Sequence, residues 1–195
     1  MATVIAVTSG KGGTGKSSIC SGMGYALAKQ GSRTLIIELD FGLRCLDIML
    51  GVKDIIQHDL GDVLAGKCDI LAASTQIKMA QNLSIVCAPE DPYATLDADQ
   101  IKEICESMRK YYDYIIIDAP AGIDDGMVVA TGGADMGIIV VTPEYSSLRN
   151  AEIVKTTLEE QGIDKIAYVV NKIDLKLIET GKAPTFEEVT KNIRD

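Results

Sequence analysis

The chain has 195 residues, of which 47% are hydrophobic and 24% charged, a balance that suits one soluble α/β domain with a sizeable core. Its formal net charge of −9 argues against a general nucleic-acid surface, because phosphate backbones are bound by clustered Lys and Arg. The sequence has neither a run of about 18 apolar residues nor a basic-then-apolar signal pattern, so we expect a cytoplasmic protein.

The cysteines and the single histidine indicate no metal or nucleophile centre. The five cysteines are odd in number and widely spaced, and no C-x-x-C pair occurs, which favours reduced thiols, several of them in the core. His58 is predicted to lie on the surface. The cysteines are Cys20, Cys45, Cys68, Cys87 and Cys105.

The first predicted strand, 3–7, leads into a glycine-rich loop and then into a helix predicted from Ser18 to Gln30. The loop contains Gly10-x-x-x-x-Gly15-Lys16-Ser17, the phosphate-binding pattern, and its strand and helix neighbours are those that pattern requires. Backbone N–H groups and the helix dipole would together attract an anion there. The predicted nucleotide-binding residues are Gly10, Lys11, Gly12, Gly13, Thr14, Gly15, Lys16, Ser17 and Ser18.

Three loop residues have separate predicted roles. Lys16 can reach the β- and γ-phosphates, and the Ser17 hydroxyl can ligate Mg²⁺. The loop chemistry alone does not require Lys11, which could be an exposed lysine on a turn.

The later strands are continuous apolar runs rather than alternating ones. This pattern indicates burial on both faces, hence a doubly wound, mostly parallel sheet with helices on both sides, in a single domain spanning 1–195. Ligands bind such sheets outside the carboxyl ends of the strands. These strands are predicted at 33–39, 83–88, 114–117, 137–142 and 166–170.

The helices between these strands follow from apolar spacing and capping residues. Asp97 is predicted to cap one helix, and Thr185 with Glu188 forms a capping box for the last. Residues 54–74 read as a loop with a short helix around Leu60, and 75–82 are left unassigned. Helices are otherwise predicted at 43–50, 98–110, 123–132 and 146–161, the last with Leu148, Ile153, Val154 and Leu158 inward.

Acidic and small residues at strand ends complete the predicted site. Asp118, which ends a very apolar strand, is expected to bind Mg²⁺ through a water. Asp40 could orient the attacking water or touch the metal shell, or it could cap helix 43–50. Gly122 could offer its N–H to the γ-phosphate, or it could be an ordinary turn glycine.

The base of a nucleotide would lie near Asn171, at the end of the last strand. An asparagine amide can both donate to and accept from a purine edge. The whole segment, Asn171-Lys172-Ile173-Asp174, resembles the guanine-reading motif of GTPases, although a polar strand-to-loop cluster would look the same.

The loop with two lysines resembles the deviant Walker A motif of the MinD/ParA family of ATPases. Residues 40–47, 118–123 and 143–149 resemble the family segments that follow in the same order, so the resemblance covers most of the chain. It implies a P-loop ATPase with ATP and Mg²⁺ as cofactors. It also implies an ATP-dependent dimerising switch of the MinD type that regulates placement of the division septum, with the regulators of the Min system as partners.

The resemblance also assigns roles. Lys11 would reach across an ATP-sandwich homodimer to the partner's phosphates, so the catalytic set becomes Lys11, Lys16 and Asp40, with Ser17 and Asp118 holding the metal. Cys45 stands where the family usually has Asn, which puts a hydrogen bond there in doubt. The family also continues into another strand, further helices and an amphipathic membrane helix, so membrane binding is not expected of this chain.

Three alternatives remain at this stage. A ParA-type partition ATPase would act on DNA, and the negative charge counts against it. A GTPase with the same core is suggested by Asn171-Lys172-Ile173-Asp174 alone. A nucleotide-binding module without hydrolysis is the third.

Overall fold

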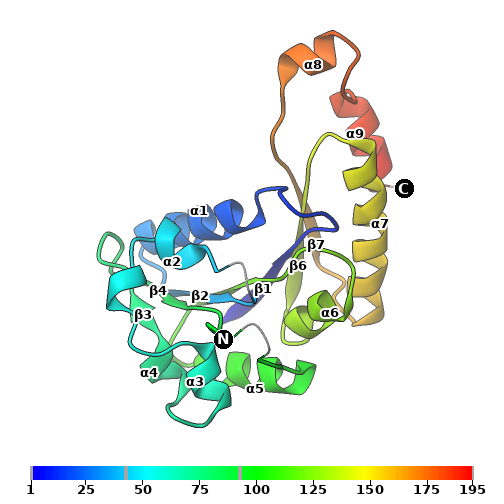
Figure 1. The fold of residues 1–195 in the computed structure, drawn as a ribbon. Helices are drawn as coiled ribbons and strands as arrows, with labels where there is room; N and C mark the ends of the chain where they lie inside the picture. Colours follow the sequence, from blue (N-terminus) through cyan, green and yellow to red (C-terminus); the bar gives the residue numbers. More distant parts are fainter. Residues whose placement is uncertain (1, 42–43, 92–93, 195) are drawn as a thin grey trace.

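The computed structural model describes residues 2–41, 44–91 and 94–194, and its centre is a seven-stranded sheet (Figure 1). The strand order is β3-β4-β2-β5-β1-β6-β7, and all neighbours pair in parallel except β3 with β4. The strands are β1 (Thr3–Thr8), β2 (Thr34–Glu38), β3 (Thr75–Gln76), β4 (Leu83–Val86), β5 (Tyr114–Asp118), β6 (Met136–Val141) and β7 (Ile166–Val170).

Helices cover both faces of this sheet, which confirms the doubly wound prediction. The helices α1 and α2 lie on one face, and α3 to α6 lie on the other, with α7 continuing that layer beside β6 (Figure 1). The helical segments are α1 (Lys16–Lys29), α2 (Leu46–Met49), the 3₁₀ turn η1 (Lys53–Ile55), α3 (Leu60–Leu64), α4 (Ile70–Ala73), α5 (Ala98–Met108), α6 (Asp125–Thr131), α7 (Tyr145–Glu160), α8 (Leu175–Glu179) and α9 (Phe186–Arg194).

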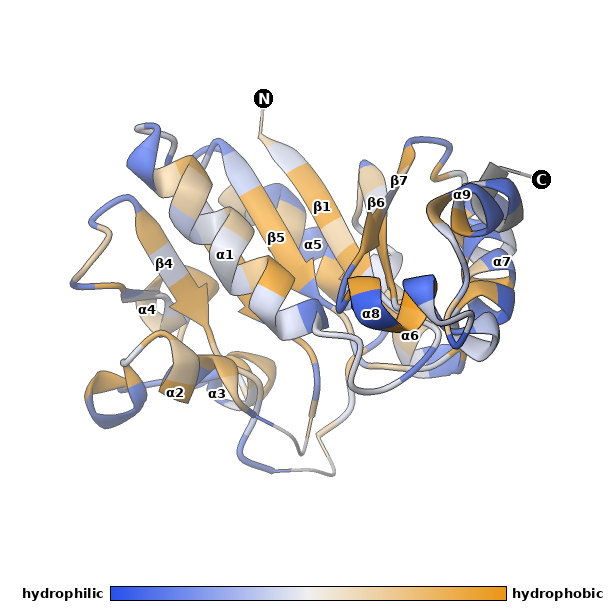
Figure 2. Ribbon diagram, turned by 90° about the horizontal axis from the view of Figure 1, so that it is seen from above, coloured by the Kyte–Doolittle hydropathy of each residue, from blue (hydrophilic) through white to orange (hydrophobic). Residues whose placement is uncertain are grey.

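The apolar strands divide their side chains between two core layers. In β5, Ile115 and Ile117 pack with the layer under α5, whereas Ile116 packs with the layer under α1. All three are fully buried, because a parallel strand between two helical layers has no solvent-facing side. Figure 2 shows the same result, with hydrophobic strands in the interior and more hydrophilic helices outside.

The predicted caps are confirmed. Asp97 accepts the N–H of Gln100 at 2.8 Å, and the Gln100 side chain accepts the N–H of Asp97 at 2.9 Å, a complete capping box at the start of α5. Glu188 accepts the N–H of Thr185 at 2.7 Å, and the Thr185 hydroxyl accepts the N–H of Glu188 at 3.2 Å, which opens α9 in the same way.

Two elements were not predicted, and two local predictions need correction. The unassigned 75–82 segment contains β3, a two-residue antiparallel edge strand, and α8 was not predicted at all. Ile153 does not point inward: it is 43% exposed, because the buried stripe of α7 runs instead through Leu148, Ala151 and Val154. Helix 43–50 begins only at Leu46 in the structure, while Leu43 lies outside the described residues.

Within the residues described, no helix combines the length and hydrophobicity needed to cross a bilayer.

Replacing Ile116 with Ala should destabilise the protein by about 2–5 kcal/mol, since it leaves a cavity between β5 and α1. Ile153→Ala, which removes the same atoms from an exposed position, should change the free energy of unfolding by less than about 1 kcal/mol. Urea denaturation followed by circular dichroism measures both. Equal losses would mean that the two core layers are wrongly assigned.

Candidate functional site

The predicted phosphate loop joins β1 to α1 and borders a cleft of about 290 Å³. Gly13 and Gly15 have φ angles of 75° and 97°, the left-handed region in which glycine avoids the Cβ clash. A side chain on Gly15 would also place its Cβ 2.3 Å from the Asn171 amide nitrogen. The loop therefore requires glycine here for both backbone angle and space.

The loop N–H groups are available to an anion. The backbone N–H groups of residues 12–15 donate to no atom among the residues that the structure describes. Successive free N–H groups at the start of a 14-residue helix form a concave anion site, and the helix dipole adds positive potential. The structure therefore agrees with the phosphate-binding interpretation of the loop.

Lys16 is the buried cation of the cleft. Its side chain is 6% exposed, and its Nζ lies 3.0 Å from Asp118 Oδ1 and 3.9 Å from Asp40 Oδ2. These carboxylates follow β2 and end β5, so the topology brings together three residues that are far apart in sequence. The predicted convergence of strand-end acids on the loop is present.

Asp118 has the geometry of a metal-site residue. It is fully buried; its Oδ1 accepts from Lys16 and, at 3.4 Å, from the Cys20 thiol. Its Oδ2 is buried without a hydrogen-bond partner among the described residues. A buried carboxylate oxygen without a partner is costly, and oxygen is the donor that Mg²⁺ prefers. Ser17 lines the loop cleft together with Lys16, the cation paired with Asp118, so the oxygen donors of Ser17 and Asp118 fit the predicted ion.

Asp40 borders the cleft and does not cap the following helix. Burial raises the pKa of the Asp40 carboxyl above its usual range, while Lys16 opposes that rise. The N–H groups of Cys45 and Leu46, at the start of α2, donate instead to Glu38 Oε1 at 2.9 and 3.0 Å. The capping alternative for Asp40 is therefore wrong.

Glu38 is a residue that our sequence reasoning missed. It is fully buried, and its Oε2 also accepts the N–H of Ala88 at 3.3 Å, so it ties α2 and the end of β4 to β2. Burial raises the pKa of its carboxyl, partly offset by these three N–H donors. The signal was present in the sequence: a lone carboxylate in the apolar run 34–39 must find donors inside the protein.

Lys11 and Gly122 both have partners within the chain. Lys11 Nζ forms an ion pair with Glu144 Oε2, and this pair lowers the pKa of the Glu144 carboxyl. The N–H of Gly122 donates to the Ser9 carbonyl at 3.0 Å. That N–H is therefore engaged, and meeting a γ-phosphate would require this bond to open.

The residues after β7 contact the loop rather than an open pocket. Asn171 Nδ2 donates to the Thr14 carbonyl at 2.8 Å, and Lys172 Nζ donates to the Gly13 carbonyl at 2.6 Å. Asp174 accepts the N–H groups of Lys176 and Leu177 as the N-cap of α8. A carboxylate used as a helix cap leaves the guanine-reading interpretation of this segment without support.

Cys45 lies in the cleft beside Ser17. Burial is the main cause that raises the pKa of the Cys45 thiol above its ordinary value, and Ser17 opposes that rise. All five cysteines are free, and three of them are buried, as predicted. The position that usually holds Asn thus lines the same cleft as the loop's serine.

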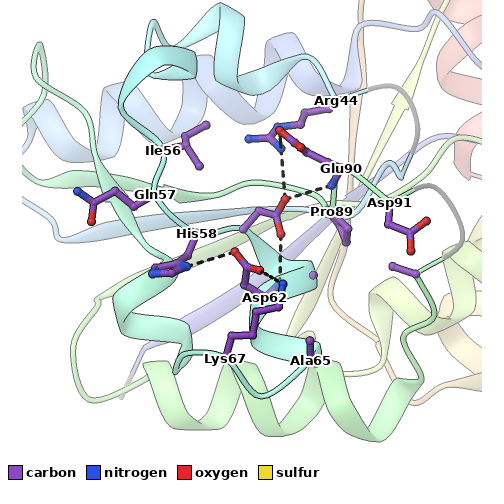
Figure 3. Close-up of a pocket in the computed structure, with 13 residues that line it drawn as sticks. Arg44, Ile56, Gln57, His58, Asp62, Ala65, Lys67, Pro89, Glu90 and Asp91 are labelled. Atoms are coloured by element: carbon purple, nitrogen blue, oxygen red, sulfur yellow. Dashed lines mark hydrogen bonds and ion pairs between the residues drawn. The ribbon is translucent and has the colours of Figure 1, made fainter.

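A larger cleft of about 450 Å³ lies beside α3 and is the one drawn in Figure 3. Its basic side chains are paired with carboxylates: Arg44 lies 3.4 Å from Asp59, while His58 and Lys67 lie 3.2 and 2.8 Å from Asp62. Figure 3 shows Arg44, His58, Asp62 and Lys67 around this cleft. Because its cations are already paired, we place the anion site at the loop and not here.

The comparisons with known proteins agree with this geometry. A family model described as an AAA domain matches residues 2–173. The septum site-determining protein MinD of Synechocystis sp. is 38% identical over 190 residues, which are 97% of this chain and 71% of that protein. The MinD of Bacillus subtilis is 36% identical over 196 residues, which are 99% of this chain and 73% of that protein.

Solved structures of the same kind superpose closely. A chain in the MinC:MinD cell division protein complex of Aquifex aeolicus has a TM-score of 0.91 and 35% identity, covering 99% of this chain and 78% of that one. The MinD of Pyrococcus horikoshii, complexed with Mg-ADP, has a TM-score of 0.87 and 27% identity, covering 100% of this chain and 78% of that one.

Lys16→Ala should weaken ATP binding at least about 100-fold, because it removes the only cation buried in the loop cleft as described. Lys67→Ala, which removes the paired lysine of the larger cleft, should leave binding unchanged. Isothermal titration calorimetry measures both.

Without Lys16, the buried Asp118 carboxylate has no counter-charge, which lowers the free energy of unfolding by about 3–5 kcal/mol. Circular dichroism must therefore show that the variant is folded, and the double variant Lys16→Ala/Asp118→Asn removes the stranded charge. Tight ATP binding by either variant, or its loss in Lys67→Ala, would mean that the site is misplaced.

Proposed function

Because the chain belongs to the MinD family of P-loop ATPases, we propose that it acts as an ATP-dependent switch in the placement of the division septum. It is a MinD-type ATPase that binds nucleotide with Mg²⁺ and hydrolyses ATP. The observation that supports this most directly is the loop cleft, where the free N–H groups lie beside Asp40 and beside Lys16, which is paired with the buried Asp118. We propose that residues 1–195 act as one nucleotide-binding domain.

The loop would bind the phosphates through its backbone. We propose that the N–H groups of residues 12–15 and the start of α1 receive phosphate oxygens, with Lys16 as the counter-charge. Gly10 and Ser18 border this cradle and complete it. Catalysis then depends on positioning and charge stabilisation rather than on a protein nucleophile.

The two carboxylates would have different roles, one in binding the metal ion and one in orienting water. We propose that Ser17 and Asp118 hold Mg²⁺, which when bound neutralises charge on the phosphate oxygens. Asp40, half-buried at the cleft, would accept a hydrogen bond from the attacking water and orient it. Gly122 would offer its N–H only after releasing Ser9.

Asn171 favours adenine over guanine. Its Nδ2 already donates to the Thr14 carbonyl, so the group left for a ligand is its amide oxygen, which has no partner among the described residues. The exocyclic amino group of adenine donates, whereas the corresponding oxygen of guanine accepts. The alternatives of a GTPase and of a DNA-partition ATPase are accordingly not favoured, the latter also because of the net charge of −9.

Lys11 is the residue that we assign to a second copy of the chain. Within one chain it forms an ion pair with Glu144, the residue before α7. We propose that ATP brings two chains face to face and that Lys11 exchanges Glu144 for the phosphates bound by the partner. The exchange replaces one carboxylate by a more highly charged anion, so it becomes favourable only when ATP is present.

Partners from the Min system fit this chain, since the Aquifex aeolicus relative is a MinD in complex with MinC. Peripheral association with the inner membrane is proposed only for a full protein that carries a C-terminal amphipathic helix.

Wild-type protein should bind ATP with Mg²⁺ more tightly than GTP, by on the order of tenfold, because the 6-amino group of adenine can donate to the Asn171 oxygen, whereas the 6-oxygen of guanine cannot. Calorimetry with both nucleotides measures the two affinities. A phosphate-release assay measures the rate of ATP hydrolysis. Asp40→Asn serves as the control: it should bind ATP normally and lose hydrolysis by about 100-fold. Tighter GTP binding, or full hydrolysis by Asp40→Asn, would contradict the proposal.

Lys11→Ala should leave ATP binding by the monomer measurable and abolish ATP-dependent dimerisation. Light scattering with ATP and Mg²⁺ gives the oligomeric state. Lys78→Ala removes an exposed lysine outside the cleft and should dimerise like the wild type. Dimers that persist in Lys11→Ala would exclude the role assigned across the interface.

A further inference from the structure

Two neighbouring residues after β7 hold two neighbouring carbonyl groups of the phosphate loop. Lys172 Nζ donates to the Gly13 carbonyl at 2.6 Å, and Asn171 Nδ2 donates to the Thr14 carbonyl at 2.8 Å. These contacts join segments 157 and 159 residues apart in the chain. The family resemblance assigns a role to Asn171 but none to Lys172.

Peptide geometry gives these contacts a consequence on the other side of the loop. In a planar trans peptide the C=O and N–H groups point in opposite directions. Drawing the carbonyls of Gly13 and Thr14 toward β7 therefore turns the N–H groups of Thr14 and Gly15 away from it. Both N–H groups belong to the set that makes no bond within the described chain.

The backbone at Lys172 is what allows both side chains to reach the loop. In an extended strand, consecutive side chains point to opposite faces, so only one of the two would contact it. Lys172 has a φ of 57°, and among the described residues it is the only one other than glycine with a positive φ. Such a conformation costs on the order of 1 kcal/mol for a residue with a Cβ, so glycine would be the unstrained choice.

The reason for a lysine at this strained position is therefore its side chain, which glycine would lack. Lys172 is exposed and packs in no core layer, so burial does not explain its place. Its side chain makes a charged hydrogen bond to the Gly13 carbonyl, and its charge also helps to lower the pKa of the Glu144 carboxyl. A strained backbone that aims an ammonium group at the loop indicates a role in the site.

We propose that Lys172 is a positioning residue, which fixes the Gly13–Thr14 peptide so that its N–H faces the nucleotide phosphates. The proposal rests on the ATPase function proposed above. Lys172 acts through the loop backbone and not by contact with the nucleotide. Because the bond is already formed in the chain without ligand, the loop would not need to be ordered again at each binding event.

The test compares Lys172→Met with Lys172→Arg in the full chain. Methionine keeps the length of the side chain and a similar backbone preference but removes the charge, so we expect ADP to bind about tenfold more weakly. Arginine keeps a charged donor and should restore at least half of the lost binding free energy. Lys176→Met, an exposed lysine on α8 whose side chain faces solvent, should bind like the wild type.

Two further measurements separate positioning from folding. Urea unfolding of the nucleotide-free variants should give the wild-type midpoint, because Lys172 is exposed. Hydrogen exchange of a peptide covering residues 10–17 should be faster in Lys172→Met without any nucleotide. That exchange result tests the positioning role even if the wild-type protein should fail to bind ATP.

The proposal is overturned if Lys172→Met binds ADP like the wild type, if Lys172→Arg binds as weakly as Lys172→Met, or if exchange of the loop is unchanged. A fall in the unfolding midpoint that matches the loss of affinity would also overturn it, since Lys172 would then be structural only.

Discussion

A buried lysine needs a negatively charged partner, and this requirement links the ends of three neighbouring strands, β1, β5 and β2. Lys16 begins α1, and its ammonium group is almost inaccessible, so an unpaired charge there would be very unfavourable. Asp118, at the end of the adjacent β5, supplies the charge, and Asp40 adds a second carboxylate from beyond β2. Of these groups, the buried cation Lys16 and its second carboxylate Asp40 also line the cleft at the phosphate loop.

The loop imposes a second constraint, since N–H groups that face an anion leave their carbonyls facing outward. Each such carbonyl needs a donor, and the protein draws donors from different elements. Asn150 of α7 donates to the Gly10 carbonyl at 2.7 Å, while Asn171 and Lys172 serve Thr14 and Gly13. The β6–α7–β7 unit is therefore part of the phosphate site, although none of its backbone belongs to the loop.

Most of the fold could be predicted from the sequence, because most strands are continuous apolar runs and α5 and α9 begin with capping boxes. The exceptions have physical reasons. The strand β3 pairs through only two residues, too few to show a period, and α8 depends on the cap that Asp174 provides. Ile153 is apolar yet exposed, because the face of α7 that packs against the sheet is decided by how the helix docks there and not by the hydrophobicity of each residue.

The sequence by itself determined the chemistry of the site: the loop motif, its lysines and the acids at the strand ends are all local patterns. It could not show what holds that chemistry in place. The role of Glu38 at the start of α2, the pairing of Lys11 with Glu144 and the bond from Lys172 to Gly13 all join residues distant in sequence or follow no motif. Only the tertiary structure decided them, because a side chain's partner is set by which strand ends become neighbours in the sheet.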